Sequence, residues 1–285
     1  MTTVLSILVA LLLLSLLVMI HELGHYLAGW ALGFSILEFS IGMGPNLVKK
    51  TKNGTEFSIR AFPIGGMCRF EGEDESVVNE RSFNAQKVWK RIVVVLSGPV
   101  MNLLFAIVCS AITLLAFGDF MPGVQAVTAE SPAAVAGVQV GDVIEQVGDK
   151  PVKFYFQTVD MIRAVESKDT TLTVDRNGEK LTLPLNNIYN EELGHNQIGV
   201  TISQVRVHFG FGASIGRSVN YVTATLVETF RFFGRAAQGD VSSSDAAGPV
   251  AIVALISEAV RSSGENVLRL LVLISAGLGI MNMLP

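Results

Sequence analysis

The chain has 285 residues, of which 50% are hydrophobic and 16% are charged, with a mean hydropathy of +0.48 and a net charge of −4. Soluble domains rarely have such a composition, so it indicates a membrane protein. The charge balance provides no basic surface for nucleic acid. Two cysteines, Cys68 and Cys109, are too few for a disulfide framework.

The first apolar stretch runs from Val4 to about Leu32 and contains the sequence His-Glu-Leu-Gly-His at residues 21–25. Membrane-spanning helices need roughly 17 to 25 residues, so residues 1–34 are predicted to hold a transmembrane segment. In a helix the two histidines lie on one face, and the glutamate is rotated by about 100° from the first of them. This is the spacing with which two imidazoles hold zinc while the glutamate acts as a general base.

A pair of buried histidines bonded to helix carbonyls is the alternative interpretation of this motif. In lipid, however, burying Glu22 beside both imidazoles without a metal would leave costly polar groups unpaired. We therefore expect His21 and His25 to be zinc ligands and Glu22 to be the catalytic base.

Residues 35–91 are predicted to form a membrane-associated β-hairpin loop in the cytoplasm. Residues 56–60 alternate like a strand, and the Asn-Gly pair at 53–54 is a strong turn signal. Gly65 and Gly66 would let the backbone approach another chain closely, and a plain surface turn fits the same residues equally well. The positive-inside rule places a loop this basic in the cytoplasm and the N-terminus outside. Its basic residues are Lys49, Lys50, Lys52, Arg60, Arg69, Arg81, Lys87, Lys90 and Arg91.

Further transmembrane segments are predicted at residues 92–117, 211–236 and 266–285. The second of these is interrupted by Arg217, Glu228 and Arg231. A Gly/Ser-rich loop that contains the sequence Gly-Pro-Val-Ala-Ile is expected at 237–265. The predicted fold class is a polytopic α-helical membrane protein with about four transmembrane segments, an inserted α+β domain and the hairpin loop.

Residues 122–200 break the apolar pattern and are predicted to be an extracytoplasmic domain. The sequence Gly-Val-Gln-Val-Gly-Asp-Val-Ile at 137–144 resembles the signature of bacterial PDZ domains. Such domains capture extended chains or C-termini by adding a strand to a sheet edge. A generic small β domain is the alternative. Turn residues separate the expected strands at 124–127, 143–147, 172–174 and 181–185 and the expected helix at 156–164.

Taken in order, these motifs resemble the site-2 protease family, specifically the RseP-type bacterial intramembrane zinc metalloproteases (peptidase M50-like) with one PDZ domain. The resemblance covers nearly the whole chain. Beyond the His-Glu-Leu-Gly-His sequence, it rests on Gly-Met-Gly-Pro at 42–45, Pro-Ile-Gly-Gly at 63–66, Ser-Gly-Pro-Val-Met-Asn at 97–102, the PDZ-like segment, Gly-Pro-Val-Ala-Ile at 248–252 and the stretch 275–285.

The resemblance implies regulated intramembrane proteolysis: cleavage within the lipid bilayer of membrane-spanning substrates such as anti-sigma factors or signal-peptide remnants. It implies a multi-pass protein of the bacterial inner membrane whose N-terminus and PDZ-like domain are extracytoplasmic. It also implies that substrate is bound by Gly65, Gly66, Asn102 and Asn282.

The family continues past the last matched stretch into a Leu-Asp-Gly motif whose aspartate is the third zinc ligand, and this chain stops at Pro285, just before it. We therefore expect a C-terminally truncated chain, because two histidines alone make an incomplete catalytic site. Two alternatives remain open. A non-catalytic membrane scaffold would present the PDZ-like domain to partners, and a metal transporter would need further intramembrane acids, which residues 92–117 do not provide.

Overall fold

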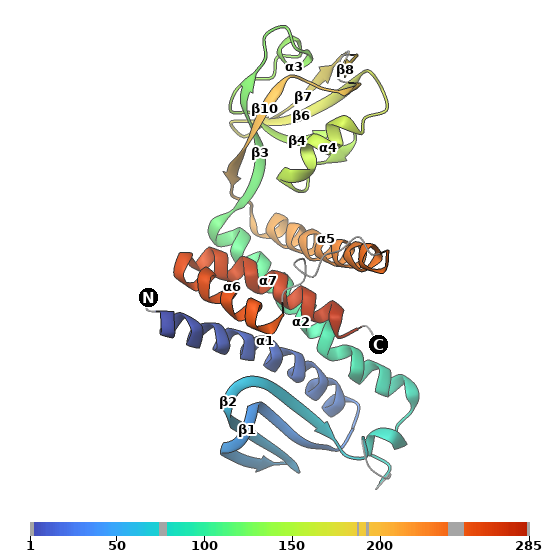
Figure 1. Cartoon of the computed structure of the whole chain (residues 1–285). Coiled ribbons are helices and arrows are strands. Elements are labelled where there is room, and N and C mark those ends of the chain that lie inside the picture. The colour runs from blue at the N-terminus through green and yellow to red at the C-terminus, as the bar shows by residue number, and fades with distance from the viewer. Residues whose placement is uncertain (1–2, 74–78, 187, 192–193, 239–247, 284–285) are drawn as a thin grey trace. The chain divides into compact units, whose positions relative to one another are not determined.

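The computed structural model describes residues 3–73, 79–186, 188–191, 194–238 and 248–283. The chain divides into two compact units, one made of Met1–Thr113 with Ser218–Pro285 and the other of Leu114–Arg217 (Figure 1). The helices are α1 (Thr3–Ala31), α2 (Val88–Phe117), α3 (Pro132–Val135), α4 (Thr158–Arg163), α5 (Phe211–Ala237), α6 (Pro249–Ser262) and α7 (Gly264–Met281). The strands are β1 (Ile36–Lys52), β2 (Thr55–Phe70), β3 (Asp119–Val127), β4 (Val143–Val147), β5 (Lys150–Pro151), β6 (Thr170–Arg176), β7 (Glu179–Leu185), β8 (Tyr189–Asn190), β9 (His195–Asn196) and β10 (Val200–Val207).

Three of the described helices, α1, α2 and α7, are long and apolar enough to cross a membrane. They correspond to the first, second and last predicted transmembrane segments. The predicted segment at 211–236 does form a helix, α5, but it is not one of these three. Charged residues interrupt its apolar pattern, so a fourth transmembrane segment stays a prediction.

Small residues let the long helices approach one another closely. A Cβ atom added at Gly24 on α1 would lie 2.3 Å from the Ser97 carbonyl oxygen on α2, and one added at Gly279 on α7 would lie 3.0 Å from the Pro99 carbonyl oxygen. Such side-chain-free contacts are how helices pack tightly where lipid removes the hydrophobic driving force. Helix α2 therefore has close contacts with both α1 and α7.

The segment 237–265, expected as a loop, contains helix α6. Pro249 occupies the first turn of α6, where its missing N–H costs nothing. Ile256 and Ala259 are both buried and are three residues apart, which is the spacing of one face of a helix. This spacing explains why the segment forms a helix. Helix α6 packs on α1, where Ser257 donates a 2.8 Å hydrogen bond to Ser6. The remainder of the expected loop, 239–247, lies outside the described residues, as do residues 284–285 at the end of the last segment.

Strands β1 and β2 form the predicted hairpin. Asn53 and Gly54 have φ angles of 53° and 86°, as a two-residue turn of the Asn-Gly type requires. Both strands bend, so that residues 38–41 of β1 pair with residues 56–59 and also with residues 66–69 of β2. The hairpin therefore folds back on itself into a compact sheet beside α1 (Figure 1).

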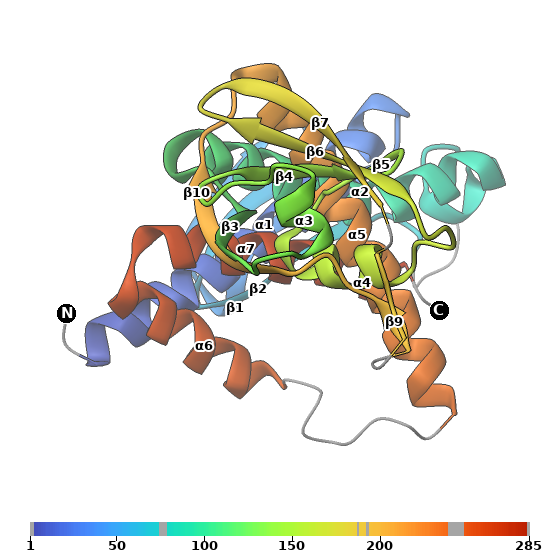
Figure 2. The same ribbon diagram turned by 90° about the horizontal axis from the view of Figure 1, so that it is seen from above.

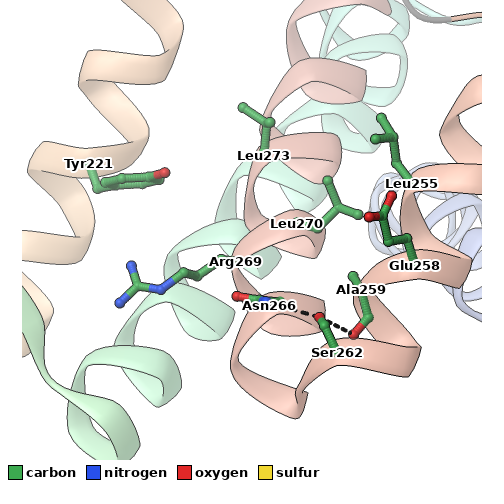
Figure 3. Close-up of a pocket in the computed structure, with 9 residues that line it drawn as sticks. All are labelled: Tyr221, Leu255, Glu258, Ala259, Ser262, Asn266, Arg269, Leu270 and Leu273. Carbon is green, nitrogen blue, oxygen red and sulfur yellow. Dashed lines mark hydrogen bonds between the residues drawn. The ribbon is translucent and has the colours of Figure 1, made fainter.

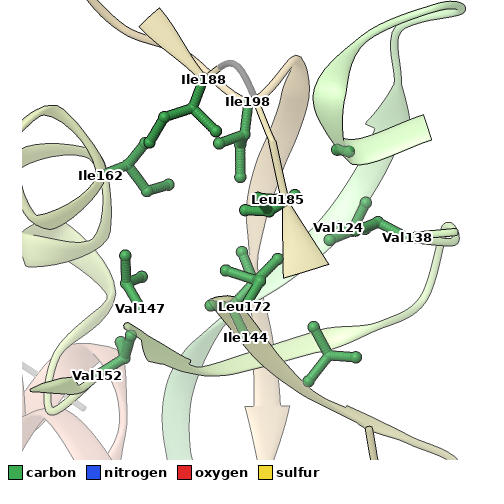
Figure 4. Packing of buried hydrophobic residues seen from close by; sticks show 12 residues of the cluster. Val124, Val138, Ile144, Val147, Val152, Ile162, Leu172, Leu185, Ile188 and Ile198 are labelled. Carbon is green, nitrogen blue, oxygen red and sulfur yellow. The ribbon is translucent and has the colours of Figure 1, made fainter. Parts of the chain in front are cut away.

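The second unit is built on a sheet with the strand order β10-β3-β4-β6-β7, to which β5 adds at β4 (Figure 2). The four predicted strands are confirmed as β3, β4, β6 and β7, and the predicted helix lies at α4 with a short 3-10 turn before it. The fully buried core contains Ile144, Leu172, Leu185 and Ile188, which converge between the sheet and α4 (Figure 4).

An ion pair explains the Gly-Asp part of the PDZ-like signature. The buried carboxylate of Asp142 accepts hydrogen bonds from Arg176 on β6 at 2.7 and 2.8 Å, and Arg176 also donates to the Gly137 carbonyl oxygen. Burial alone would raise the pKa of Asp142, but the hydrogen bonds from Arg176 and from the Gln139 backbone N–H outweigh it and lower the pKa. The signature loop is thus tied to β6.

Candidate metal centre

The two histidines of the motif lie together on one face of α1. Their Nε2 atoms are 3.1 Å apart, and the two rings meet edge to face with centroids 4.8 Å apart. Both side chains are half-buried. The helical spacing of four residues therefore brings two imidazole nitrogens to one point, as the sequence predicts.

The other ring nitrogen of His25 contacts α2. Its Nδ1 atom lies 2.8 Å from the carbonyl oxygen of Val94. A carbonyl can only accept, so this bond places the proton on Nδ1 and leaves a lone pair on Nε2. Metal-binding histidines are commonly oriented in this way by a backbone carbonyl. His25 is thus held in the tautomer that can bind a metal through Nε2.

Gly98 on α2 leaves the space in front of the two rings open. A Cβ atom at this position would lie 2.4 Å from His25 Nε2 and 2.9 Å from His21 Cε1. Pro99 follows inside the same helix and lacks an N–H, so the hydrogen-bond ladder of α2 is interrupted where the histidines approach it. The open space, the convergent nitrogens and the oriented tautomer all fit a zinc ion held by His21 and His25.

A third ligand is not found among the residues that the structure describes. Within them, no three His, Cys, Asp or Glu side chains are grouped closely enough to hold a metal ion. The described part of the chain therefore supplies two imidazoles at this point.

Glu22 is half-buried and faces the hairpin. A Cβ atom at Gly66 on β2 would lie 3.1 Å from the Cγ atom of Glu22 and 3.1 Å from the Ser40 carbonyl oxygen. Gly65 has a φ of +83°, a conformation that other residues rarely adopt. The structure thus brings Gly66 to the glutamate, and a side chain at 66 would fit only if its neighbours shifted by a few tenths of an ångström.

The two predicted asparagines are placed differently. Asn102 on α2 is fully buried, with its Nδ2 atom 3.3 Å from His21 Nδ1. Asn282 is exposed at the end of α7, where its backbone N–H donates to the Leu278 carbonyl oxygen.

Sequence reasoning gave no role at the site to Gly98 or Val94. A Gly-Pro pair inside an apolar span, which is unusual in a helix interior, was the available signal for Gly98.

A separate cavity of about 450 Å³ lies between α5, α6 and α7 (Figure 3). In it Tyr221 of α5 faces Arg269 and Leu273 of α7 across an open space. Arg269 pairs with Glu265 one turn earlier, and none of the His-Glu-Leu-Gly-His residues lines this cavity. It is therefore distinct from the histidine site.

A histidine pair with a glutamate beside it lies on an apolar helix long enough to cross a membrane, and comparison with known proteins identifies the family of the chain. The sequence profile of peptidase family M50 matches residues 9–285, and the chain belongs to this family. Zinc is the cofactor of the family. The chain is thus a member of a zinc-dependent peptidase family that contains three helices able to cross a membrane.

Bacterial proteins named "putative zinc metalloprotease" are similar over nearly the whole chain. One from Clostridium acetobutylicum is 30% identical over 98% of this chain and 82% of its own length. One from Mesorhizobium japonicum is 29% identical over 95% of this chain and 82% of its own length. One from Agrobacterium fabrum is 28% identical over 96% of this chain and 80% of its own length.

Replacing Gly98 by alanine is expected to weaken zinc binding by at least about tenfold, because the new methyl group would occupy the space at the two Nε2 atoms. Zinc affinity in detergent of the purified protein extended through the aspartate motif, measured by competition with a chelating dye, tests this. Gly277→Ala is the matched control, since a Cβ atom at that helical glycine meets no atom within 4 Å. Unchanged zinc affinity in folded Gly98→Ala would contradict the assignment of the site.

Proposed function

We propose that this protein is an intramembrane zinc metalloprotease that performs site-2 cleavage of membrane-spanning substrates, such as anti-sigma factors or signal-peptide remnants. The observation that carries the proposal is the convergence of His21 and His25, with Nε2 atoms 3.1 Å apart, inside a helix able to cross a membrane. Ionisable groups inside a membrane are costly and mark functional sites. Membership of a zinc-dependent peptidase family supports the same function.

The roles proposed for the site residues follow from their positions. His21 and His25 hold the metal, together with the aspartate expected beyond Pro285. When bound, zinc would supply Lewis acidity that makes water a better nucleophile near neutral pH. Glu22, the residue that follows His21 on the helix, would take a proton from the attacking water and give it to the leaving amine.

The hairpin is proposed to receive the substrate. A helical peptide bond is shielded by its own hydrogen bonds, so a transmembrane substrate has to unwind before water can attack it. In the described part of the hairpin, residues 66–69 of β2 have a strand partner on one side only, at residues 38–41. An unwound segment that adds to the free side of β2 would run past Gly65 and Gly66 toward Glu22. Asn282 is proposed as a further substrate contact.

Replacing Glu22 by glutamine is expected to lower substrate cleavage by roughly 100-fold or more while zinc stays bound, because an amide cannot take a proton from water. The measurement pairs cleavage of a single-span model substrate with zinc content, in protein extended through the aspartate motif. Glu166→Gln, the same change at an exposed residue outside the site, is the control. Cleavage near the wild-type rate in the glutamine variant would exclude Glu22 as the base.

The sheet unit is proposed to be a PDZ-like domain that binds an extended peptide or a C-terminus. A groove of about 160 Å³ lies between α4, which contributes Val159, Ile162 and Arg163, and the first residues of β10. Strand β10 is at the edge of the sheet, where an added strand can pair. The same groove would serve a non-catalytic scaffold, which is the alternative function.

Val159→Lys is expected to reduce binding of a fluorescent peptide with a free C-terminal valine by about tenfold or more, because the lysine projects into an apolar groove wall. Fluorescence anisotropy with the full protein in detergent measures the affinity. Val135→Lys is the matched control, since Val135 is 80% exposed and lies outside the groove. Equal affinity of the two variants would count against peptide capture at this groove.

The protein is proposed to lie in the bacterial inner membrane with the hairpin in the cytoplasm and the N-terminus and PDZ-like domain outside. Basic side chains gather where α1 ends: Lys90 donates to the Leu32 carbonyl oxygen and Arg81 to that of Gly33, each at 3.1 Å. Cations there complement the negative end of the helix dipole. They are part of the positive charge that favours a cytoplasmic location.

A cysteine introduced at Ser167 is expected to react with a membrane-impermeant thiol reagent in intact cells, whereas one introduced at Asn53 reacts only after lysis. Both positions are exposed, so accessibility in the protein does not limit either reaction. The background replaces Cys68 and Cys109 by alanine. The reverse labelling pattern would invert the proposed orientation.

A further inference from the structure

Asn102 is the polar side chain of α2 that contacts the zinc-site histidine His21. We propose that Asn102 is a positioning residue for His21: its side-chain oxygen accepts the Nδ1 proton and so directs the Nε2 lone pair to the metal. The inference rests on the proposed zinc site and replaces the substrate contact that the resemblance implied for Asn102.

Asn102 is fully buried in the described structure, where its side chain contacts His21. The residue has no exposed surface, and its Nδ2 atom lies 3.3 Å from His21 Nδ1. Its Oδ1 atom is equally buried, and no donor within the described residues reaches it. A buried amide oxygen without a partner is unfavourable, typically by about 1–3 kcal/mol, so this atom needs a donor.

The chemistry of imidazole identifies that donor. A neutral histidine carries one proton, so binding a metal through Nε2 requires the proton to be on Nδ1. The Nδ1–H group then needs an acceptor; the Asn102 amide is the side chain at that atom, and the backbone of Gly98 also bonds to the ring. A half-turn of the amide about its Cβ–Cγ bond exchanges Nδ2 and Oδ1, which brings the oxygen to Nδ1. His25 obtains the same orientation from the Val94 carbonyl oxygen.

Helix α7 holds the backbone of Asn102 in place. The hydroxyl of Ser275, which is fully buried, donates a 2.8 Å hydrogen bond to the Asn102 carbonyl oxygen. Gly279, one turn further on, allows α7 to approach Pro99 and Leu103 closely. Helices α2 and α7 therefore together fix the position of the Asn102 side-chain amide at His21. A residue that orients a metal ligand has to be held in place in this way.

Two substitutions separate an orienting role from a merely structural one. Asn102→Leu keeps a similar volume and removes the acceptor, whereas Asn102→Asp keeps the acceptor. Thr113→Val is the matched control, because Thr113 is a buried polar residue of α2 whose hydroxyl bonds to Cys109, away from the histidines. The protein is extended through the aspartate motif, and the readouts are zinc affinity in detergent, by competition with a chelating dye, and the visible absorption of the cobalt-substituted protein.

Asn102→Leu is expected to weaken zinc binding by roughly 10- to 100-fold and to change the cobalt spectrum, because His21 loses its fixed tautomer. Asn102→Asp and Thr113→Val are both expected to bind zinc with an affinity within about threefold of the wild type. Asn102→Asp keeps an acceptor at His21, and Thr113 lies away from the histidines.

Wild-type affinity and an unchanged cobalt spectrum in Asn102→Leu would overturn the positioning role while leaving the zinc site intact. If the leucine variant does not fold, Asn102→Asp decides, and a loss of tenfold or more in folded protein would overturn the role. Absence of zinc binding in the wild type would overturn both this inference and the proposed function.

Discussion

The geometry of the histidine pair, which is the proposed metal site, depends on one close contact between α1 and α2 that larger side chains would prevent. Gly24 brings the backbone of α1 against the Ser97 carbonyl oxygen, and Gly98 leaves the space in front of both imidazoles open. At this separation His25 reaches the Val94 carbonyl oxygen, and His21 reaches Asn102. Any larger residue at Gly24 or Gly98 would separate the helices or displace the rings, so the geometry of the site is a consequence of helix packing.

A membrane-embedded site also has to satisfy its polar groups from within the protein, because lipid offers no hydrogen bonds. The described helices do this by pairing across helix contacts: Ser257 with Ser6, and Ser275 with the Asn102 carbonyl oxygen. Serine is small enough to bond without separating the helices. The same bonds that hold the bundle together therefore also fix the residue that contacts His21.

Substrate handling and chemistry are assigned to different parts of the chain. The hairpin reaches Glu22 through Gly66, where a Cβ atom would make a tight contact of 3.1 Å with the Cγ atom of the glutamate. The sheet unit is a separate compact unit whose groove, at α4 and β10, would select partners by their extended segments or C-termini. Its Asp142–Arg176 pair stabilises the PDZ-like signature loop, so part of that signature reflects folding and not peptide binding.

The sequence by itself determined the features that depend on neighbours a few residues apart. Helical spacing put His21 and His25 on one face, apolar length predicted α1, α2 and α7, and the Asn-Gly pair predicted the hairpin turn. Only the tertiary structure decided that Asn102, 81 residues from His21, contacts its ring, that Gly66 lies against Glu22, and that α6 packs on α1. These contacts join residues far apart in the chain, and periodicity and turn signals carry no information on which distant surfaces meet.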